Sequence, residues 1–221
     1  MAQNHEQFAV VLAGLRERLR TGLGVRGEPL IVNDLAGALG VSATPVREAL
    51  AQLAGEGLIE DRRRRGYYAW RVDTSDLEDL YRAQELLTMT ALADLTRQTR
   101  RAAAPALEGA PTSHMDLAPL SRADDGAEAV LFWEALTWRM AKEAGHRFFL
   151  NAQQRLSDRL APARQLEPAV LDEGRDALAG LAERVNRRDW RALSETLPSF
   201  FVRRRAAAGA IIAKLRDEPR S

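Results

Sequence analysis

The chain has 221 residues, of which 46% are hydrophobic and 29% are charged, and its formal net charge is +1. Its length and apolar content suffice for one large core or two small ones. Its near-neutral charge excludes a globally basic coat protein and a disordered acidic chain. The absence of cysteine excludes disulfides, thiol nucleophiles and thiolate metal sites. No apolar run reaches the roughly 18–20 residues of a membrane helix, and the N-terminus lacks a signal-peptide pattern, so we expect a soluble, cytoplasmic protein with no membrane partner.

The spacing of apolar residues predicts three helices in the first quarter of the chain, over about residues 7–20, 30–39 and 42–56. Asn33 or Asp34 can cap the second helix, and Ser42 can cap the third. Gly40 permits the tight turn between these two helices, and Gly57 can adopt the left-handed conformation of a helix end. A turn of this kind between two short helices is typical of a helix-turn-helix.

A change of pattern after Gly57 predicts a basic hairpin. Two short strand-forming segments, 58–60 and 67–72, flank four consecutive arginines, Arg62 to Arg65, and Gly66. An arginine run by itself is most often a solvated surface. Beside a DNA-reading helix it would neutralise phosphates and release counterions, or insert into a narrow minor groove.

From Asp73 onward the pattern is almost entirely helical. The helices expected after the one that starts near Thr74 cover about residues 127–144, 147–166, 168–187 and 190–215, with a loop over 101–119 and a polar tail over 216–221. We therefore place residues 1–73 in a small mixed domain and residues 74–221 in a helical bundle.

The first turn of the third helix carries residues suited to DNA. Ser42 can hold a phosphate near the free N–H groups of the helix, and Thr44 can contact a phosphate or a thymine methyl group. Arg47 can fork onto guanine, a pairing worth roughly 1–3 kcal/mol of discrimination, while Pro45 fits the first helical turn. The alternative is that Ser42 only caps the helix and Arg47 is a surface residue paired with a glutamate.

Residues 30–72 resemble the winged-helix domain of GntR-type bacterial transcriptional regulators, and the segment GVSATPVREALAQLAGEGLI is close to the hallmark of that family. The implied fold is mainly α: an N-terminal winged helix-turn-helix, with three helices and a β-hairpin wing, followed by an all-α bundle. With the arginine run included, the predicted DNA-contacting residues are Asn33, Ser42, Ala43, Thr44, Pro45, Arg47, Arg62, Arg63, Arg64, Arg65 and Gly66. The family usually has arginine where this chain has Ala43, so either the operator differs or the wing carries more of the affinity.

The helical half resembles the FadR-like branch of the family, whose bundle dimerises and binds a small effector. In many members that effector is an organic acid held by a metal on one aspartate and three histidines. The positions that match those ligands hold other residues here: Ala129, Trp133, Gly174 and the region of Phe200. The histidines of this chain, His5, His114 and His146, are scattered, so we expect no metal and no cofactor.

Gln84 and Thr88 stand where the family has arginine and glutamate. An anionic effector would therefore lose the arginine as well as the metal that usually hold it. Two interpretations remain open. The bundle binds a more neutral or aromatic molecule lined by Gln84, Trp133 and Trp138, or large side chains such as Trp133 and Phe200 fill the interior and leave no effector site.

We predict a bacterial sequence-specific regulator that binds double-stranded DNA as a homodimer on a palindromic operator. The expected mode is repression relieved by a small-molecule effector. The alternative is a winged-helix adaptor or structural DNA-binding protein with a filled, effector-free bundle. An enzyme is not expected, because the chain lacks a glycine-rich phosphate loop and a Gly-x-Ser-x-Gly motif, and Asp158 and Glu173 fit helix-surface carboxylates.

Overall fold

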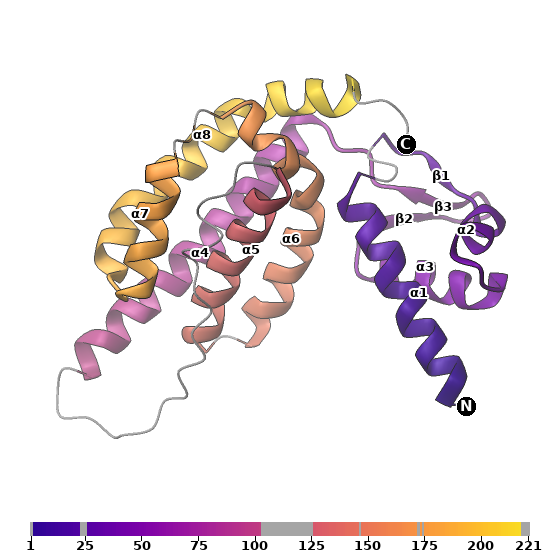
Figure 1. Ribbon diagram of the computed structural model, residues 1–221, viewed down its shortest axis with the longest axis horizontal. Helices are drawn as coiled ribbons and strands as arrows, with labels where there is room; N and C mark the ends of the chain where they lie inside the picture. Colours follow the sequence, from indigo (N-terminus) through magenta and orange to yellow (C-terminus); the bar gives the residue numbers. More distant parts are fainter. Residues whose placement is uncertain are drawn as a thin grey trace.

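The computed structural model describes residues 2–22, 26–102, 126–145, 147–171, 173 and 175–217. Its elements are, in chain order, α1 (Ala2–Arg20), β1 (Pro29–Leu30), α2 (Val32–Leu39), α3 (Ala43–Gly55), β2 (Ile59–Arg62), β3 (Gly66–Ala69), α4 (Thr74–Ala102), α5 (Gly126–Glu143), α6 (Arg147–Leu166), the 3₁₀ helix η2 (Glu167–Ala169), α7 (Arg175–Asn186) and α8 (Trp190–Asp217). The elements α1 to β3 lie beside a bundle of α4 to α8 (Figure 1). The predicted fold class, a winged helix-turn-helix followed by an all-α bundle, is confirmed.

The three N-terminal helices share one hydrophobic core with the small sheet. Val11 and Leu15 from α1 join Val46, Leu50 and Leu53 from α3 in this core, and each of these side chains is at most 1% exposed. Because apolar residues recur every three or four positions, each helix buries one face and leaves the other in solvent. The opposite face of α3 is therefore available to a partner.

The helix ends follow the predicted glycine positions. Gly40 ends α2 with a φ of +66°, and Gly57 follows α3 with a φ of +74°. Beyond Gly57, the N–H of Leu58 donates to the carbonyl oxygen of Leu53 at 2.9 Å. Such left-handed helix ends favour glycine because it has no Cβ atom.

The start of α2 differs from the prediction. Leu30 belongs to β1 and not to the helix, which begins at Val32. Ile31 occupies the N-cap position without a side-chain hydrogen bond, so the prediction that Asn33 or Asp34 caps this helix is wrong. The sequence pattern did not reveal β1, because two residues are too few to show an alternation of side chains.

The sheet has the antiparallel order β1-β3-β2. The strands β2 and β3 form the predicted hairpin, with Arg62 opposite Gly66 at its tip. Strand β1 adds a third member by pairing with β3, which anchors the hairpin to the start of α2.

Two hydrophobic clusters hold the bundle together. In one, Trp133 from α5 and Phe200 and Phe201 from α8 are buried with residues of α4 and α7. In the other, Leu77 and Tyr81, near the start of α4, pack with residues of α6 and α8. Helix α4 runs along α8, and α5 packs on α6 (Figure 1).

The helix predicted over residues 168–187 is shorter in the structure. Helix α6 ends at Leu166 as predicted, a 3₁₀ turn covers Glu167–Ala169, and α7 covers only Arg175–Asn186. Pro168 explains why α6 ends where it does, because proline disfavours the helical conformation of the residue before it.

Other boundaries move by a few residues. Helix α4 extends to Ala102, and the rest of the loop predicted over 101–119 lies outside the described residues. Helix α8 continues to Asp217, two residues beyond the predicted end. Among the described helices, none combines the length and apolarity needed to cross a bilayer.

Candidate nucleic-acid interface

The first turn of α3 presents polar groups to solvent. Ser42, Thr44 and Arg47 are exposed, whereas Val46 and its neighbours on the opposite face are buried. The guanidinium of Arg47 makes no hydrogen bond or ion pair with another described residue, so the predicted alternative of a glutamate partner is not seen. Ser42 occupies the N-cap position with an extended backbone, but its hydroxyl makes no capping hydrogen bond. The hydroxyl and the free N–H groups of this turn are therefore available to an anion.

The remaining predicted residues of the helix-turn-helix differ in exposure. Asn33 is exposed on the first turn of α2, and Ala43 is half-buried. Pro45 is buried in the core side of α3, which corrects its prediction as a DNA-contacting residue. Its role is to set the start of the helix, because proline suits a first helical turn.

The hairpin wing carries the four predicted arginines, all exposed. Arg62 is held within the hairpin, because it pairs with Glu60 at 2.8 Å and stacks 4.1 Å from the ring centroid of Tyr68. Arg63, Arg64 and Arg65 have no side-chain partner among the described residues. Three guanidinium groups of the run are thus unpaired, not four.

The backbone of the wing tip is a tight turn. The N–H of Arg65 donates to the carbonyl oxygen of Arg62 at 2.7 Å. Arg64 has a φ of +66° and Gly66 a φ of +90°. A left-handed non-glycine residue is uncommon, and here it lies in the turn that joins β2 to β3, where all four arginines are exposed.

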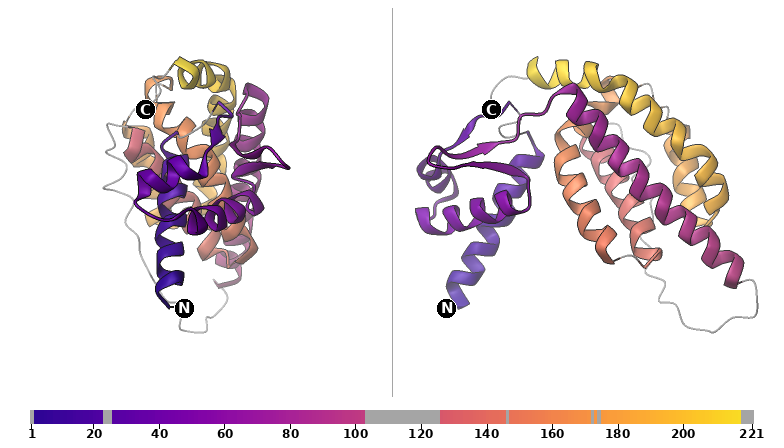
Figure 2. Two further views of the ribbon diagram at one scale, coloured as in Figure 1. Left: turned by 90° about the vertical axis from the view of Figure 1, so that its right-hand side faces the viewer. Right: turned by 180° about the vertical axis from the view of Figure 1, so that it is seen from behind.

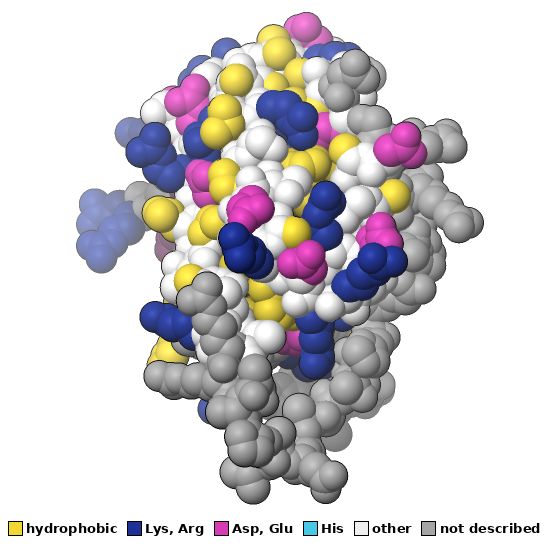
Figure 3. All heavy atoms as spheres, turned by 90° about the vertical axis from the view of Figure 1, so that its left-hand side faces the viewer, with side chains coloured by type: hydrophobic (Ala, Val, Ile, Leu, Met, Phe, Trp, Pro, Cys, Tyr) yellow, Lys and Arg dark blue, Asp and Glu magenta, His cyan; other side chains and the backbone are white. Residues whose placement is uncertain are grey.

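Helix α3 and the wing both belong to the N-terminal elements, which lie beside the bundle. The left panel of Figure 2 shows the side of these elements that is turned away from the bundle, and there the wing projects sideways, to the right. The opposite side, formed by the bundle, shows Lys, Arg, Asp and Glu side chains intermixed (Figure 3). The unpaired cations of α3 and the wing are exposed within one small group of elements, so a polyanion can meet local positive charge there although the net charge of the chain is only +1.

An ionic cluster joins α1 to the bundle. Arg16 pairs with Asp158 and with Glu56, each at 2.5 Å, and Arg20 pairs with Asp158 at 2.8 Å and Glu134 at 2.7 Å. The side chain of Asp158 is only 2% exposed. The interpretation of Asp158 as a helix-surface carboxylate is therefore wrong: it is a buried ion-pair partner.

The pKa of the Glu56 carboxyl depends on the burial and the hydrogen bonds that this cluster creates. Burial raises the pKa of the Glu56 carboxyl, but hydrogen bonds from Gln52 and Arg16 outweigh it, so the net pKa is lowered from its ordinary value. The charged form that holds Arg16 is thus the favoured one. Sequence reasoning missed this cluster, and the signal that could have found it is the i, i+4 pair of arginines on α1.

A second contact joins the bundle to the chain just after α3. Arg159 of α6 donates from Nε to the carbonyl oxygen of Gly57 at 3.0 Å. Its guanidinium also lies 4.4 Å from the ring centroid of Trp70, in the segment between β3 and α4. The orientation of α3 relative to the bundle is therefore held at two places besides the chain connection, and neither was predicted.

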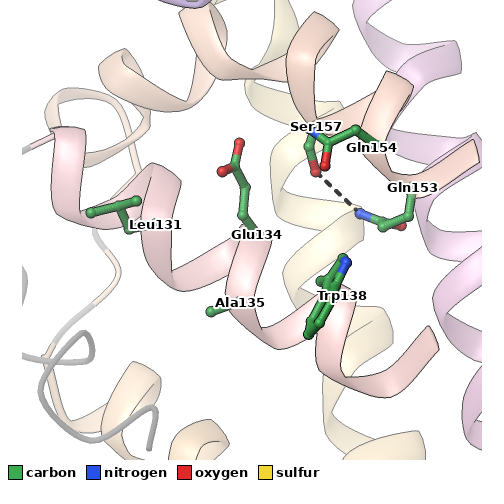
Figure 4. A pocket seen from close by; sticks show the side chains of 7 residues that line it. All are labelled: Leu131, Glu134, Ala135, Trp138, Gln153, Gln154 and Ser157. Carbon is green, nitrogen blue, oxygen red and sulfur yellow. Dashed lines mark hydrogen bonds between the residues drawn. The ribbon is translucent and has the colours of Figure 1, made fainter. Parts of the chain in front are cut away.

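The three predicted effector-pocket residues do not come together. Trp133 is 1% exposed, and its ring lies 5.9 Å from that of Phe200 and 4.0 Å from the guanidinium of Arg204. Gln84 is buried, and its Oε1 accepts a hydrogen bond from Arg164. Trp138 instead lines an open groove between α5 and α6 (Figure 4). The region around Trp133 matches the alternative in which large side chains fill the interior.

A buried ion cluster closes the same interior. Arg204 pairs with Glu167 at 2.8 Å and with Glu173 at 2.6 Å, and the hydroxyl of Tyr81 donates to Glu167 at 2.8 Å. Burial lowers the pKa of Arg204, but the two carboxylates outweigh it and raise the pKa. Glu173 lies between η2 and α7 and not on a helix surface, which corrects its predicted position.

Arg164 contrasts with Arg204, because its guanidinium is buried without a carboxylate partner among the described residues. Its Nε and Nη1 have no hydrogen-bond partner, and neither have the Nε2 of Gln84 and the Oγ1 of Thr88. Burial lowers the pKa of Arg164. Buried polar groups of this kind cost free energy unless water or another group satisfies them.

No group of three or more His, Asp or Glu side chains in the described residues could hold a metal ion. The side chains of His5, His114 and His146 lie outside the described residues, as do the side chain of Ala129 and Gly174. The absence of a metal therefore stays a prediction.

A helix-turn-helix with an exposed reading helix and a basic hairpin beside it defines a winged-helix DNA-binding domain. Residues 9–68 match the family model described as "Bacterial regulatory proteins, gntR family". The N-terminal part of the chain is a GntR-family helix-turn-helix domain, as the resemblance predicted.

Curated relatives match over the same part of the chain. An uncharacterized HTH-type transcriptional regulator in an unstable DNA locus of Streptomyces ambofaciens is 41% identical over 81 residues, 35% of this chain and 34% of the relative. The Nta operon transcriptional regulator of Aminobacter aminovorans is 36% identical over 66 residues, 30% of this chain and 31% of the relative. The chain thus spans about a third of the length of the curated relatives it matches.

Solved structures extend the likeness of the fold to nearly the whole chain. The Escherichia coli protein McbR/YncC has a TM-score of 0.64 at 18% identity, covering 95% of this chain and 98% of that one. A putative GntR regulator from Rhodococcus sp. RHA1 has a TM-score of 0.51 at 17% identity, covering 97% and 100%. The curated relatives are described as transcriptional regulators, in agreement with the prediction that this chain is not an enzyme.

Proposed function

We propose that this protein is a sequence-specific DNA-binding transcriptional regulator. The observation that carries the proposal is the unpaired Arg47 on the exposed turn of α3, in the same GntR-family domain as the unpaired wing arginines. Helix α3 enters the major groove, where the Arg47 fork fits the two acceptors of guanine. The Ser42 hydroxyl and the free N–H groups of the same turn bind a phosphate.

Because Ala43 replaces the arginine usual in the family, a larger share of the DNA affinity falls on the wing. A half-buried alanine offers no hydrogen bond to a base, so base reading from this turn falls on Arg47 and Thr44. The arginines of the wing supply phosphate contacts, which position the domain and depend on salt.

The regulator acts as a homodimer on a palindromic operator and represses by blocking polymerase. One winged helix reads only a few base pairs, and two copies about 34 Å apart recover specificity through two-fold symmetry. A small-molecule effector, acting in the cytoplasm, releases the repressor by favouring one arrangement of the DNA-binding elements over another.

The direct test is selection of bound duplexes from a random pool with the purified protein. Repeated enrichment of a palindrome with two half-sites supports the proposal. Enrichment of no common sequence, with binding that depends on salt alone, would support the structural DNA-binding alternative. Failure to bind any duplex would support the adaptor alternative.

Neutralising the wing should weaken binding to all duplexes. In the triple variant Arg63→Gln, Arg64→Gln, Arg65→Gln, we expect both operator and random DNA to bind more weakly, with a shallower dependence on salt. Each lost phosphate contact should reduce the slope of log K against log salt by about 0.9. Arg191→Gln, an exposed arginine of α8 paired with Glu195, is the control and should leave the slope unchanged. An unchanged slope in the triple variant would remove the wing from the interface.

Chelation should not alter DNA affinity. Since the family's metal-ligand positions hold other residues in this chain, we expect the same operator affinity before and after EDTA treatment, measured by fluorescence anisotropy. A loss of affinity that zinc restores would contradict the metal-free interpretation.

The effector site must lie away from Trp133. That ring is enclosed by Phe132, Phe200, Phe201 and the guanidinium of Arg204, whose charge is already matched by carboxylates. Of the three residues predicted to line an effector pocket, Trp138 is the one that lines an open groove.

A further inference from the structure

We propose that the groove between α5 and α6 binds a small organic cation with an apolar body, and that this ligand competes with Arg20 for the carboxylate of Glu134. The groove has a volume of about 270 Å³. Its lining residues are Leu131, Glu134, Ala135, Trp138, Gln153, Gln154 and Ser157 (Figure 4). Ligand binding itself is independent of the proposed DNA-binding function, and only its regulatory consequence rests on it.

One part of the groove is apolar and exposed. Leu131 is 50% exposed and Trp138 is 36% exposed, and they lie two turns apart on the same face of α5. Exposed large apolar side chains that line a concave surface are typical of a ligand site, because a ligand body can cover them. The volume, close to the lower end for small-molecule sites, limits the ligand to a single ring or a short alkyl chain.

The charge of the groove selects a cation. Glu134 is the single ionisable residue among those that line it, and its carboxylate points from α5 into the space toward α6 (Figure 4). The guanidinium of Arg20, which lies outside the lining, pairs with this carboxylate at 2.7 Å, so a ligand cation gains the charge by replacing Arg20. The ring of Trp138 is a surface that cations contact, since Lys142 Nζ lies 4.8 Å from its centroid, and a ligand cation on that ring would replace the Lys142 ammonium.

Polar groups opposite Glu134 complete the site. Gln154 and Ser157 of α6 line the groove beside Gln153, whose Nε2 donates to Ser157 Oγ at 3.4 Å and to Thr137 Oγ1 at 2.7 Å. The Nε2 of Gln154 donates to Asp158 at 3.1 Å. The Gln154 amide oxygen is therefore placed at the rim as an acceptor for an ammonium group, which has three donors.

Glu134 is shared between the groove and the contact that holds α1. Its carboxylate accepts from Arg20 at 2.7 Å, with about a fifth of the Glu134 side chain exposed. A second hollow between α1 and the bundle is lined on its bundle side by Glu134, Gln154 and Asp158, so the two spaces meet at Glu134 and Gln154. A cation that reaches Glu134 from the groove thus meets the carboxylate whose Oε1 accepts from Arg20.

Competition at Glu134 links the ligand to the position of the reading helix. Once the ligand takes Glu134, Arg20 keeps Asp158 but loses its other bundle partner. Helix α1 shares its core with α3, so a weaker contact between α1 and the bundle changes how firmly α3 is held. By linkage, the Arg20 contact must weaken ligand binding by the same factor by which the ligand weakens the contact.

The test uses the full chain without DNA and three probes of one shape: phenethylammonium, 2-phenylethanol and phenylacetate. Titration calorimetry and tryptophan fluorescence measure binding. We expect saturable binding of phenethylammonium, weaker binding of the alcohol and none of the acid. The fluorescence change should disappear in Trp138→Phe. Equal or tighter binding of phenylacetate would overturn the proposal.

Two variants test the competition. Glu134→Gln should weaken phenethylammonium by about tenfold to a hundredfold, because it removes a charge-assisted hydrogen bond. Arg20→Gln should instead tighten it several-fold, a gain that a merely damaged fold would not produce. Glu183→Gln, a carboxylate on α7 paired with Arg187, is the control and should bind like the wild type. Unchanged affinity in both Glu134→Gln and Arg20→Gln would overturn the competition.

A second copy of the chain is the other occupant to test. Sedimentation of the same samples shows whether the groove is covered in the dimer. If Trp138 fluorescence changes with protein concentration and not with phenethylammonium, the groove is an interface between copies and the proposal is wrong. A Trp138 signal that follows the probe at every protein concentration supports it.

Discussion

Replacing Arg47 with alanine is expected to weaken binding to the selected operator by about tenfold to a hundredfold, while binding to random DNA changes little. The exposed, unpaired guanidinium on the first turn of α3 is placed to read guanine, and one bidentate contact is worth roughly 1–3 kcal/mol. Anisotropy titrations at one fixed salt concentration measure both affinities, because salt changes each of them.

Arg191→Ala is the matched control for this experiment, since it removes an exposed arginine from α8 without touching the winged helix. It should bind both duplexes like the wild type. If Arg47→Ala weakened operator and random DNA equally, Arg47 would be a phosphate contact and not a base reader. If it weakened neither, the interface would have to lie elsewhere and the proposed function would lose its main support.

Replacing Arg204 with methionine is expected to lower the free energy of unfolding by about 3–5 kcal/mol. Arg204 is nearly fully buried and pairs with Glu167 and Glu173, and its guanidinium also stacks on Trp133. Methionine fills much of the volume but leaves two buried carboxylates without their cation, which is the costly way to break a buried ion pair. Urea denaturation followed by circular dichroism gives the measurement.

Arg164→Met provides the contrast within the same bundle. Arg164 is equally buried but has two nitrogen atoms without a partner among the described residues. Methionine therefore removes a desolvated charge and leaves no ion-paired carboxylate behind, but it leaves the Oε1 of Gln84 without its donor. Because these two effects oppose each other, we expect a change in the free energy of unfolding of about 1 kcal/mol or less, well below the loss in Arg204→Met. A loss as large as that of Arg204→Met would show that Arg164 is satisfied by a group absent from the described contacts.

The winged helix was largely predictable because its signals are local. Gly40 and Gly57 stand where the chain needs a left-handed helix end, and the spacing of apolar residues shows which face of α3 is buried. The hairpin was also visible, as an arginine run and a glycine between two strand-forming segments. The error here concerns the N-cap of α2, which β1 displaces. The pattern also did not reveal that Glu60 and Tyr68 hold Arg62 within the hairpin.

The bundle was predictable as a set of helices but not as a site. Trp133 and Trp138 both suggest a pocket from their sequence positions, yet one is enclosed and the other lines a groove. Trp133 and Trp138 are five positions apart on α5, so their side chains point in directions about 140° apart around the helix axis. Which of the two faces the interior depends on the helices packed around α5. Asp158 was misjudged for the same reason, because its partners Arg16 and Arg20 lie more than a hundred residues away.

The sequence by itself determined the kind of domain at the N-terminus and the exposed polar face of α3, since both depend on residues within a few turns of one another. Only the tertiary structure decided where α1 meets the bundle, which arginines are free, and which acidic groups are buried. Those outcomes depend on pairings between distant segments, and the strength of a charge pair depends on the burial that such packing creates.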